Sequence, residues 1–136
     1  MDITEQLIRD EGLVLDPYRD SRGFLSIGVG HNLDARGISE RAAIVILEDD
    51  LQDTKTALLG KFPWMRDLSP ARLGAFINLA FNMGVAGLSE FRKTLRLAES
   101  GEWVAASEQL LESLYATQVG DRARRVAQQL KTDEWV

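Results

Sequence analysis

Cysteine is absent from this sequence of 136 residues, and histidine occurs once. The lack of cysteine excludes disulfides, thiol nucleophiles and cysteine-ligated metal sites. A conventional zinc site is also excluded, because a single imidazole supplies too few ligands. Proline is scarce, with 3 residues against 11 glycines, and 45% of the residues are hydrophobic. These proportions are typical of a folded globular domain and exclude collagen-like and low-complexity chains.

Long hydrophobic runs are missing as well. No segment approaches the roughly 18 consecutive apolar residues that a membrane-spanning helix needs. Residues 1–11 lack the basic region and the apolar region of a signal peptide. We therefore expect a protein made in the cytoplasm, without stable membrane insertion.

The first part of the chain contains few basic residues. Residues 1–60 carry 12 acidic and 6 basic side chains, whereas residues 61–136 carry 9 acidic and 10 basic ones. The whole chain has a net charge of −5. Phosphate contacts require a basic surface, so we expect no nucleic-acid partner.

The N-terminal third combines one helix with a small β-structure. Asp2 and Glu5 form a capping-box pattern that opens a helix ending near Glu11. Asp16-Pro17 and residues 20–23 predict turns. Residues 24–29 alternate in polarity, with Leu25, Ile27 and Val29 on one face and Ser26 on the other, polar face. This pattern predicts a β-hairpin or a short meander.

The remainder of the sequence is helical in pattern. Ser39 caps a long helix over about 39–59, whose apolar stripe is Ala43, Leu47, Leu51, Thr54 and Leu58. A second helix begins at Ser69-Pro70, is apolar almost all round and ends at Gly84, which places it at the centre of the core. Further helices are expected over about 89–99, 102–114 and 121–131, the last capped by Asp121.

These elements predict an α+β fold, mostly α, in a single domain over 1–136. A small lobe over about 12–59 contains the β-structure. The larger helical lobe comprises about 60–136 together with the N-terminal helix, and the long helix joins the two. We expect a cleft between the lobes, where ligands commonly bind.

Two carboxylates and a hydroxyl lie close together in the sequence. Glu11 ends the first helix, and the negative end of a helix disfavours an ionised carboxylate, which suits Glu11 to proton donation. Asp20 lies in a polar turn that favours its ionised form. Ser26 can orient a water molecule from the polar face of the strand. An acid, a base and a water-binding hydroxyl are the parts of an inverting glycosidase.

Several separated motifs share their order with one known family. They are Asp10-Glu11-Gly12-Leu13, residues 18–23, residues 26–31, residues 77–84 and residues 120–126. Together these motifs resemble the phage-type lysozymes, the muramidase family of the T-even phages. The resemblance covers nearly the whole chain and implies a lysozyme-like fold.

The resemblance assigns roles to particular residues. It makes Glu11 the general acid, makes Asp20 the carboxylate that activates water, and places Ser26 where the family usually has threonine. Serine keeps the hydroxyl but lacks the methyl group that restricts χ1. The family's substrate-contacting positions correspond to Asn32, Phe81, Thr94 and Gln109.

Supporting roles also follow from the resemblance. Arg122 and Arg125 share a helix face, and the family places this pair behind the catalytic carboxyl. Arg122 is thus expected to reach Glu11, and Arg125 to reach Asp10.

The single histidine has a structural interpretation in the same family. His31 ends the strand and is expected to pair with Asp50 of the long helix. Only residues 32–38 separate His31 from that helix, fewer than in the T-even enzymes, so the resemblance implies a shortened family member with a reduced small lobe.

The function implied by the resemblance is that of a peptidoglycan hydrolase. Such an enzyme cleaves the β-1,4 bond between N-acetylmuramic acid and N-acetylglucosamine with inversion, without metal or organic cofactor. We expect a monomeric endolysin that accumulates in the host cytoplasm and reaches the wall in the periplasm after a holin-type membrane lesion. Two alternatives stay open: a lytic transglycosylase, and an inactive wall-binding or assembly module of the same fold.

Overall fold

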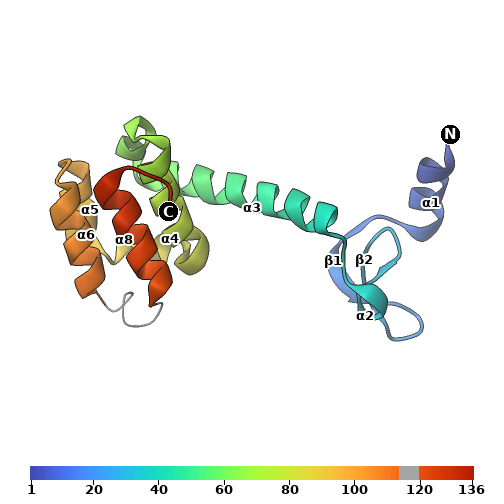
Figure 1. The fold of residues 1–136 in the computed structure, drawn as a ribbon. Helices are drawn as coiled ribbons and strands as arrows, with labels where there is room; N and C mark the ends of the chain where they lie inside the picture. Colours follow the sequence, from blue (N-terminus) through green and yellow to red (C-terminus); the bar gives the residue numbers. More distant parts are fainter. Residues whose placement is uncertain (114–119) are drawn as a thin grey trace. The chain divides into compact units, whose positions relative to one another are not determined.

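The computed structural model describes residues 1–113 and 120–136, which form two compact units, Met1–Ile46 and Leu47–Val136. Helices predominate, and a small antiparallel sheet lies in the first unit, so the expected mostly-α α+β fold is confirmed (Figure 1). The grouping of the N-terminal helix with the helical lobe, and the cleft between the lobes, stay predictions.

The first unit consists of one helix, a three-stranded sheet and a second short helix. Its elements are α1 (Ile3–Glu11), β1 (Val14–Arg19), β2 (Leu25–Gly28), β3 (His31–Asn32) and α2 (Leu33–Arg36). The sheet is an antiparallel meander in the order β1-β2-β3, as the sequence predicts. The expected capping box opens α1, since the Glu5 amide donates to Asp2 and the Asp2 amide donates to Glu5.

The prediction of a turn at Asp16-Pro17 is wrong, because both residues lie inside β1. Pairing between β1 and β2 is irregular from Val14 to Tyr18. Proline has no backbone N–H and is confined to edge strands and bulges of a sheet. β1 is an edge strand of this sheet, so its irregular stretch accommodates Pro17.

The short helix α2 is fastened to the sheet by one carboxylate. Asp34 Oδ2 accepts a hydrogen bond from the Leu25 amide at 2.7 Å and forms an ion pair with Arg19 at 3.3 Å. The Asn32 side chain caps the helix by accepting from the Ala35 amide at 3.0 Å. These three contacts link α2 to all three strands of the sheet.

The helix α3 (Glu40–Lys61) runs from the first unit into the second. Its N-terminus is capped as expected, because Ser39 Oγ accepts from the Ala42 amide at 3.1 Å. Of its predicted apolar stripe, only Leu58 is fully buried. Leu47 and Leu51 are 39% and 37% exposed and line a cavity of the second unit.

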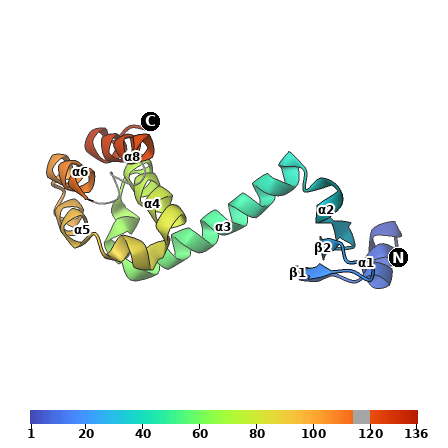
Figure 2. The same ribbon diagram turned by 90° about the horizontal axis from the view of Figure 1, so that it is seen from below.

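The second unit is entirely helical among the described residues. It contains the end of α3 followed by η1 (Pro63–Asp67), α4 (Pro70–Ser89), α5 (Arg92–Glu99), α6 (Trp103–Glu112) and α8 (Asp121–Thr132). Helix α6 packs against α5 and α8, and α8 also packs against α4 (Figures 1 and 2). The last residue of the helix expected over 102–114 lies outside the described residues.

Helix α4 forms the centre of this unit, as its apolar sequence predicts. Phe76 and Leu79 are completely buried, and Ser69 and Pro70 occupy the expected cap and first helical positions. Gly84 breaks the helical geometry with φ 79° and ψ 159°, but the helix resumes and ends only at Ser89. By length and composition alone α4 could cross a membrane; its buried side chains are those of a core helix.

The capping of α8 differs from the expectation. Asp121 is the first helical residue and pairs with Arg124 at 2.7 Å, whereas Gly120 occupies the cap position without a side-chain hydrogen bond. A carboxylate in the first turn still interacts favourably with the positive end of the helix. Elsewhere in α8, the Gln129 side chain donates to the Ala71 carbonyl at 2.6 Å and ties the helix to α4.

Candidate active site

The predicted catalytic residues Glu11, Asp20 and Ser26 all belong to the first unit. They are distributed along β2, the central strand of the sheet. Asp20 lies in the turn that precedes this strand, Ser26 lies within it, and Glu11 contacts the turn that follows it.

Asp20 is held by the backbone of its own turn. Its Oδ1 accepts hydrogen bonds from the amides of Arg22 at 2.8 Å and Phe24 at 2.9 Å. The turn is closed by the amide of Asp20 donating to the Phe24 carbonyl and the amide of Gly23 donating to the Asp20 carbonyl. Asp20 Oδ2 has no hydrogen bond to any described residue, so it is available to accept a hydrogen bond from a ligand or a water molecule.

Ser26 is the only residue of β2 that is buried, with 2% of its surface exposed. It pairs with Tyr18 on one side and with Asn32 on the other. The face expected to be polar is therefore the more buried one, because Ser26 is buried while Leu25 and Ile27 on the other face are only partly buried. Within the part of the chain described, the Ser26 hydroxyl has no hydrogen-bond partner. A buried hydroxyl without a partner costs about 1–3 kcal/mol unless a water or ligand satisfies it.

Glu11 ends α1 and its side chain extends to the turn between β2 and β3. A Cβ built on Gly30 would lie 3.1 Å from Glu11 Oε2 and 3.4 Å from its carboxyl carbon. Gly30 also has φ +64°, which residues other than glycine rarely adopt. Both the close approach of Glu11 and the positive φ therefore favour glycine at this position. Sequence reasoning did not single out Gly30 by itself; the available signal was its place within the family motif over residues 26–31.

The ends of β2 are well separated. The strand has four residues, and a rise of about 3.3 Å per residue places its ends about 10 Å apart. Glu11 approaches one end of the strand and Asp20 the other. A retaining glycosidase holds its two carboxyl groups about 5–5.5 Å apart, whereas an inverting one uses a wider spacing that admits a water molecule.

The remaining predicted residues of the first unit have local partners. Asp10 forms an ion pair with Arg9 at 2.8 Å. Asn32 caps α2 through its side chain, and His31 Nε2 donates to the Gly37 carbonyl. The pairings of Asp10 with Arg125 and of His31 with Asp50 join residues of different units, and they stay predictions.

In the second unit, the structure brings Thr94 and Gln109 together. Both line a cavity of about 370 Å³ between α5 and α6. Thr94 is almost completely buried, whereas Gln109 is half-buried. Of the predicted substrate-contacting positions in this unit, these two therefore share one concave surface.

Phe81 lines a different cavity, of about 590 Å³, with Arg122 and Trp135. Arg122 donates from Nε to Asn78 Oδ1 at 2.9 Å and from Nη2 to the Asn78 carbonyl at 3.3 Å, which fixes α8 against α4. Arg125 is exposed and has no ion pair with any described residue. The roles of these arginines beside Glu11 and Asp10 stay predictions.

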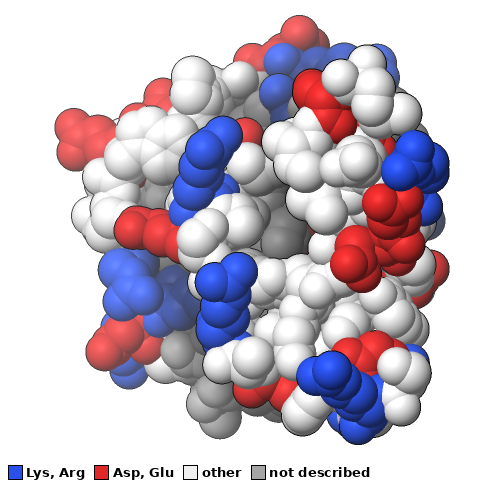
Figure 3. Space-filling view, turned by 90° about the vertical axis from the view of Figure 1, so that its right-hand side faces the viewer, with Lys and Arg blue, Asp and Glu red and all other residues white. Residues whose placement is uncertain are grey.

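Basic and acidic side chains are interspersed over the face drawn in Figure 3. The described residues contain no group of three or more His, Cys, Asp or Glu side chains arranged to hold a metal ion. The carboxyl groups of Glu11 and Asp20 and the hydroxyl of Ser26 are the groups of the first unit that could transfer protons or orient water.

Comparison with known proteins identifies the family of the chain. The family model described as phage lysozyme matches residues 9–130. The chain belongs to the phage lysozyme family. The match includes Glu11, Asp20 and Ser26 and extends through most of α8. The resemblance of the separated sequence motifs to phage lysozymes is thereby confirmed.

Individual relatives come from a cellular organism and from phages. A probable T4-type lysozyme of Dictyostelium discoideum is 29% identical, over 96% of this chain and 94% of its own length. The pre-baseplate central spike protein Gp5 of Enterobacteria phage T4 is 29% identical, over 93% of this chain and 27% of its own length. The SAR-endolysin of Escherichia phage Mu is 28% identical, over 82% of this chain and 66% of its own length. Membership of the phage lysozyme family supports a lysozyme-like hydrolase of the bacterial wall.

Proposed function

We propose that this phage lysozyme family member is a muramidase that cleaves peptidoglycan between N-acetylmuramic acid and N-acetylglucosamine with inversion. The observation that carries the proposal is the arrangement along β2. Glu11 lies against the turn at one end, Asp20 forms the turn at the other, and the Ser26 hydroxyl lies between them. This separation suits an acid and a base that act on a sugar from opposite sides.

In the proposed reaction, Glu11 donates its proton to the glycosidic oxygen as the bond from that oxygen to the anomeric carbon breaks. A water molecule attacks the same carbon from the other face. Asp20 Oδ2 accepts the proton of that water, and the Ser26 hydroxyl orients it. The turn amides that donate to Asp20 Oδ1 hold the carboxylate in place and leave Oδ2 for the water. No cofactor takes part in these steps.

Analysis of the released fragments tests the proposed bond and outcome. Purified peptidoglycan from Gram-negative cells should yield fragments with a free reducing N-acetylmuramic acid, initially as the α-anomer in the NMR spectrum. A lytic transglycosylase would instead release 1,6-anhydro ends, which are lighter by one water molecule. A module that binds the wall without cutting it would release no fragments.

We propose further that the chain acts in host-cell lysis as an endolysin, without a stable partner chain. In this role it accumulates in the host cytoplasm and reaches peptidoglycan in the periplasm once a holin-type pore has opened the membrane. A relative from phage Mu that is named an endolysin supports the part of this role that concerns host-cell lysis. Expression in Escherichia coli should lyse the cells only when a holin is expressed as well.

The contact between Gly30 and Glu11 gives the first prediction. Gly30→Ala should lower the free energy of unfolding by about 1–2 kcal/mol, because alanine is strained at positive φ. It should also reduce wall lysis about tenfold or more, since the new Cβ displaces the Glu11 carboxyl. Gly28→Ala is the matched control, with φ +70° and nothing within 4 Å of its Cβ. Equal lysis by the two variants at equal folded fraction would contradict the proposed placement of Glu11.

The buried hydroxyl of Ser26 gives the second prediction. Ser26→Ala should leave the free energy of unfolding unchanged or raise it, because the removed hydroxyl has no partner among the described residues. Wall lysis by the same variant should fall about tenfold or more, because the attacking water loses its hydrogen bond. Ser26→Thr keeps the hydroxyl and should retain activity. Full activity of the Ser26→Ala variant would show that Ser26 takes no part in the mechanism.

A further inference from the structure

Asp34, in the first turn of α2, contacts both strands that lead into the turn carrying Asp20. Its Oδ2 accepts a hydrogen bond from the Leu25 amide at 2.7 Å and forms an ion pair with Arg19 Nη1 at 3.3 Å. Arg19 is the last residue of β1, Leu25 is the first residue of β2, and the two are partners in the sheet. One carboxylate oxygen therefore bridges the two residues that flank the turn over 20–24.

A further hydrogen bond extends this bridge into the turn itself. Arg19 Nη1 also donates to the Gly23 carbonyl at 3.2 Å. The Gly23 amide in turn donates to the Asp20 carbonyl at 2.9 Å. The contacts that begin at Asp34 thus continue through Arg19 and Gly23 to the backbone of Asp20.

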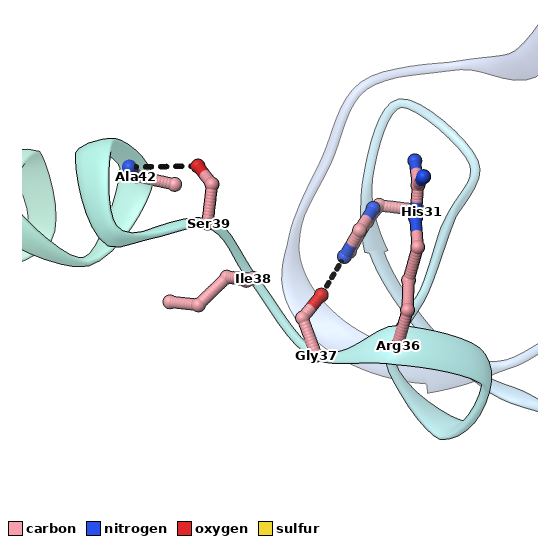
Figure 4. A pocket seen from close by; sticks show the side chains of 6 residues that line it. All are labelled: His31, Arg36, Gly37, Ile38, Ser39 and Ala42. Carbon is pink, nitrogen blue, oxygen red and sulfur yellow. Dashed lines mark hydrogen bonds between the residues drawn. The ribbon is translucent and has the colours of Figure 1, made fainter.

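The helix that carries Asp34 is itself fixed on β3. An isolated helix of four residues is unstable, because too few hydrogen bonds form to offset its nucleation. The Asn32 side chain caps the start of α2 by accepting from the Ala35 amide at 3.0 Å. At the other end, His31 Nε2 donates to the Gly37 carbonyl (Figure 4). Asp34 is therefore presented to the turn from a helix that β3 holds at both ends.

The two contacts of the Asp34 carboxylate differ in strength. The side chains of Arg19 and Asp34 are 66% and 45% exposed, so water screens their ion pair and its contribution is small. The hydrogen bond from the Leu25 amide is short, and an ionised acceptor strengthens it. We expect this hydrogen bond to provide most of the restraint on the turn. Asparagine at position 34 offers an oxygen to the same amide, whereas alanine offers none.

We propose that Asp34 is a positioning residue, which fixes the base of the turn and thereby holds Asp20 Oδ2 where it meets the attacking water. The inference rests on the proposed function, because it takes Asp20 as the base of the muramidase reaction. Asp34 acts through Leu25 and Arg19, since its hydrogen bonds go to these residues and not to Asp20. Its loss should therefore slow the chemical step and leave glycan binding unchanged.

Steady-state kinetics on soluble linear peptidoglycan test the positioning role. Asp34→Ala should lower kcat about tenfold at equal folded fraction and leave KM unchanged, because the base is displaced while the substrate contacts remain. Asp34→Asn should stay within about twofold of the parent, since it keeps the acceptor for the Leu25 amide. Asp16→Ala is the matched control, because Asp16 is exposed and has no ion pair with another described residue. Parental kcat in Asp34→Ala, or equal losses in Asp34→Ala and Asp34→Asn, would overturn the inference.

Combination with Asp20→Asn separates positioning from a general structural role. In the Asp20→Asn background, Asp34→Ala should cost less than about twofold in kcat, because no base is left to position. A residue that only supports the fold would lower kcat by the same factor in both backgrounds. A further tenfold loss in the double variant would therefore refute the inference.

NMR spectra separate this inference from the proposed function. The carboxyl carbon of Asp20 and the backbone amides of Arg22 and Phe24, which donate to it, should shift in Asp34→Ala and much less in Asp34→Asn. Peptidoglycan cleavage by the parent together with unshifted signals in Asp34→Ala would refute the positioning role and leave the muramidase standing. Shifted signals in a protein whose parent cleaves no peptidoglycan would refute the muramidase and support the restraint of the turn by Asp34.

Discussion

Glu11→Gln should reduce peptidoglycan lysis by about a hundredfold or more, the range expected for the loss of a general acid. Glutamine keeps the length and shape of the side chain, so its contact with Gly30 is retained. It carries no transferable proton, however, and the leaving sugar would depart as an unprotonated alkoxide. Initial rates of turbidity loss on permeabilised Gram-negative cells measure the effect.

Glu40→Gln is the control for this measurement. It removes the same charge from the same unit, at an exposed position on the first turn of α3. The control should lyse cells at the parental rate, and both variants should unfold at the parental temperature. A Glu11→Gln enzyme that retains more than about a tenth of parental activity would exclude Glu11 as the general acid.

Asp20→Asn should cause a loss of similar size, again about a hundredfold or more. The asparagine Oδ1 can still accept hydrogen bonds from the amides of Arg22 and Phe24, so the turn should keep its structure. The neutral amide cannot accept the proton of the attacking water. Asp16→Asn in β1 is the control, since Asp16 is exposed and has no ion pair with another described residue.

The nature of the remaining activity distinguishes the mechanisms. An inverting enzyme that lacks its base is slow but still releases fragments with a free reducing end. The mass of the fragments should therefore be measured as well as the rate of their release. A lytic transglycosylase needs no base for water, and its Asp20→Asn variant would keep most of its activity. That result would refute the assignment of Asp20.

Features that depend on neighbouring residues in the sequence were predictable. The capping box of Asp2 and Glu5, and the Ser69-Pro70 start of α4, consist of contacts within one helical turn, so their residue types predict them. The central position of α4 followed from an apolar character on all sides. The family motifs correctly identified a phage lysozyme, because motifs in a shared order are specific even when each one is short.

Features that depend on distant residues were not predictable from pattern. Proline is typical of turns, so the sequence predicts a turn at Pro17. Only the edge position of β1 in the folded sheet explains why Pro17 lies within a strand. Alternation placed Ser26 correctly opposite its neighbours, but the sequence did not indicate which face of the strand is enclosed. The approach of Glu11 to Gly30 joins residues from different elements, and glycine leaves no hydrophobic or charge pattern by which to predict such a contact.

The turn that holds Asp20 has a consequence for how the sequence can vary. The groups that fix the carboxylate are backbone amides, which every residue except proline supplies. Substitutions of the side chains at positions 22 and 24 should therefore leave the two hydrogen bonds to Asp20 in place. Proline at either position is the exception, because it deletes a donor. A carboxylate held by main-chain donors thus keeps its position while the side chains around it change.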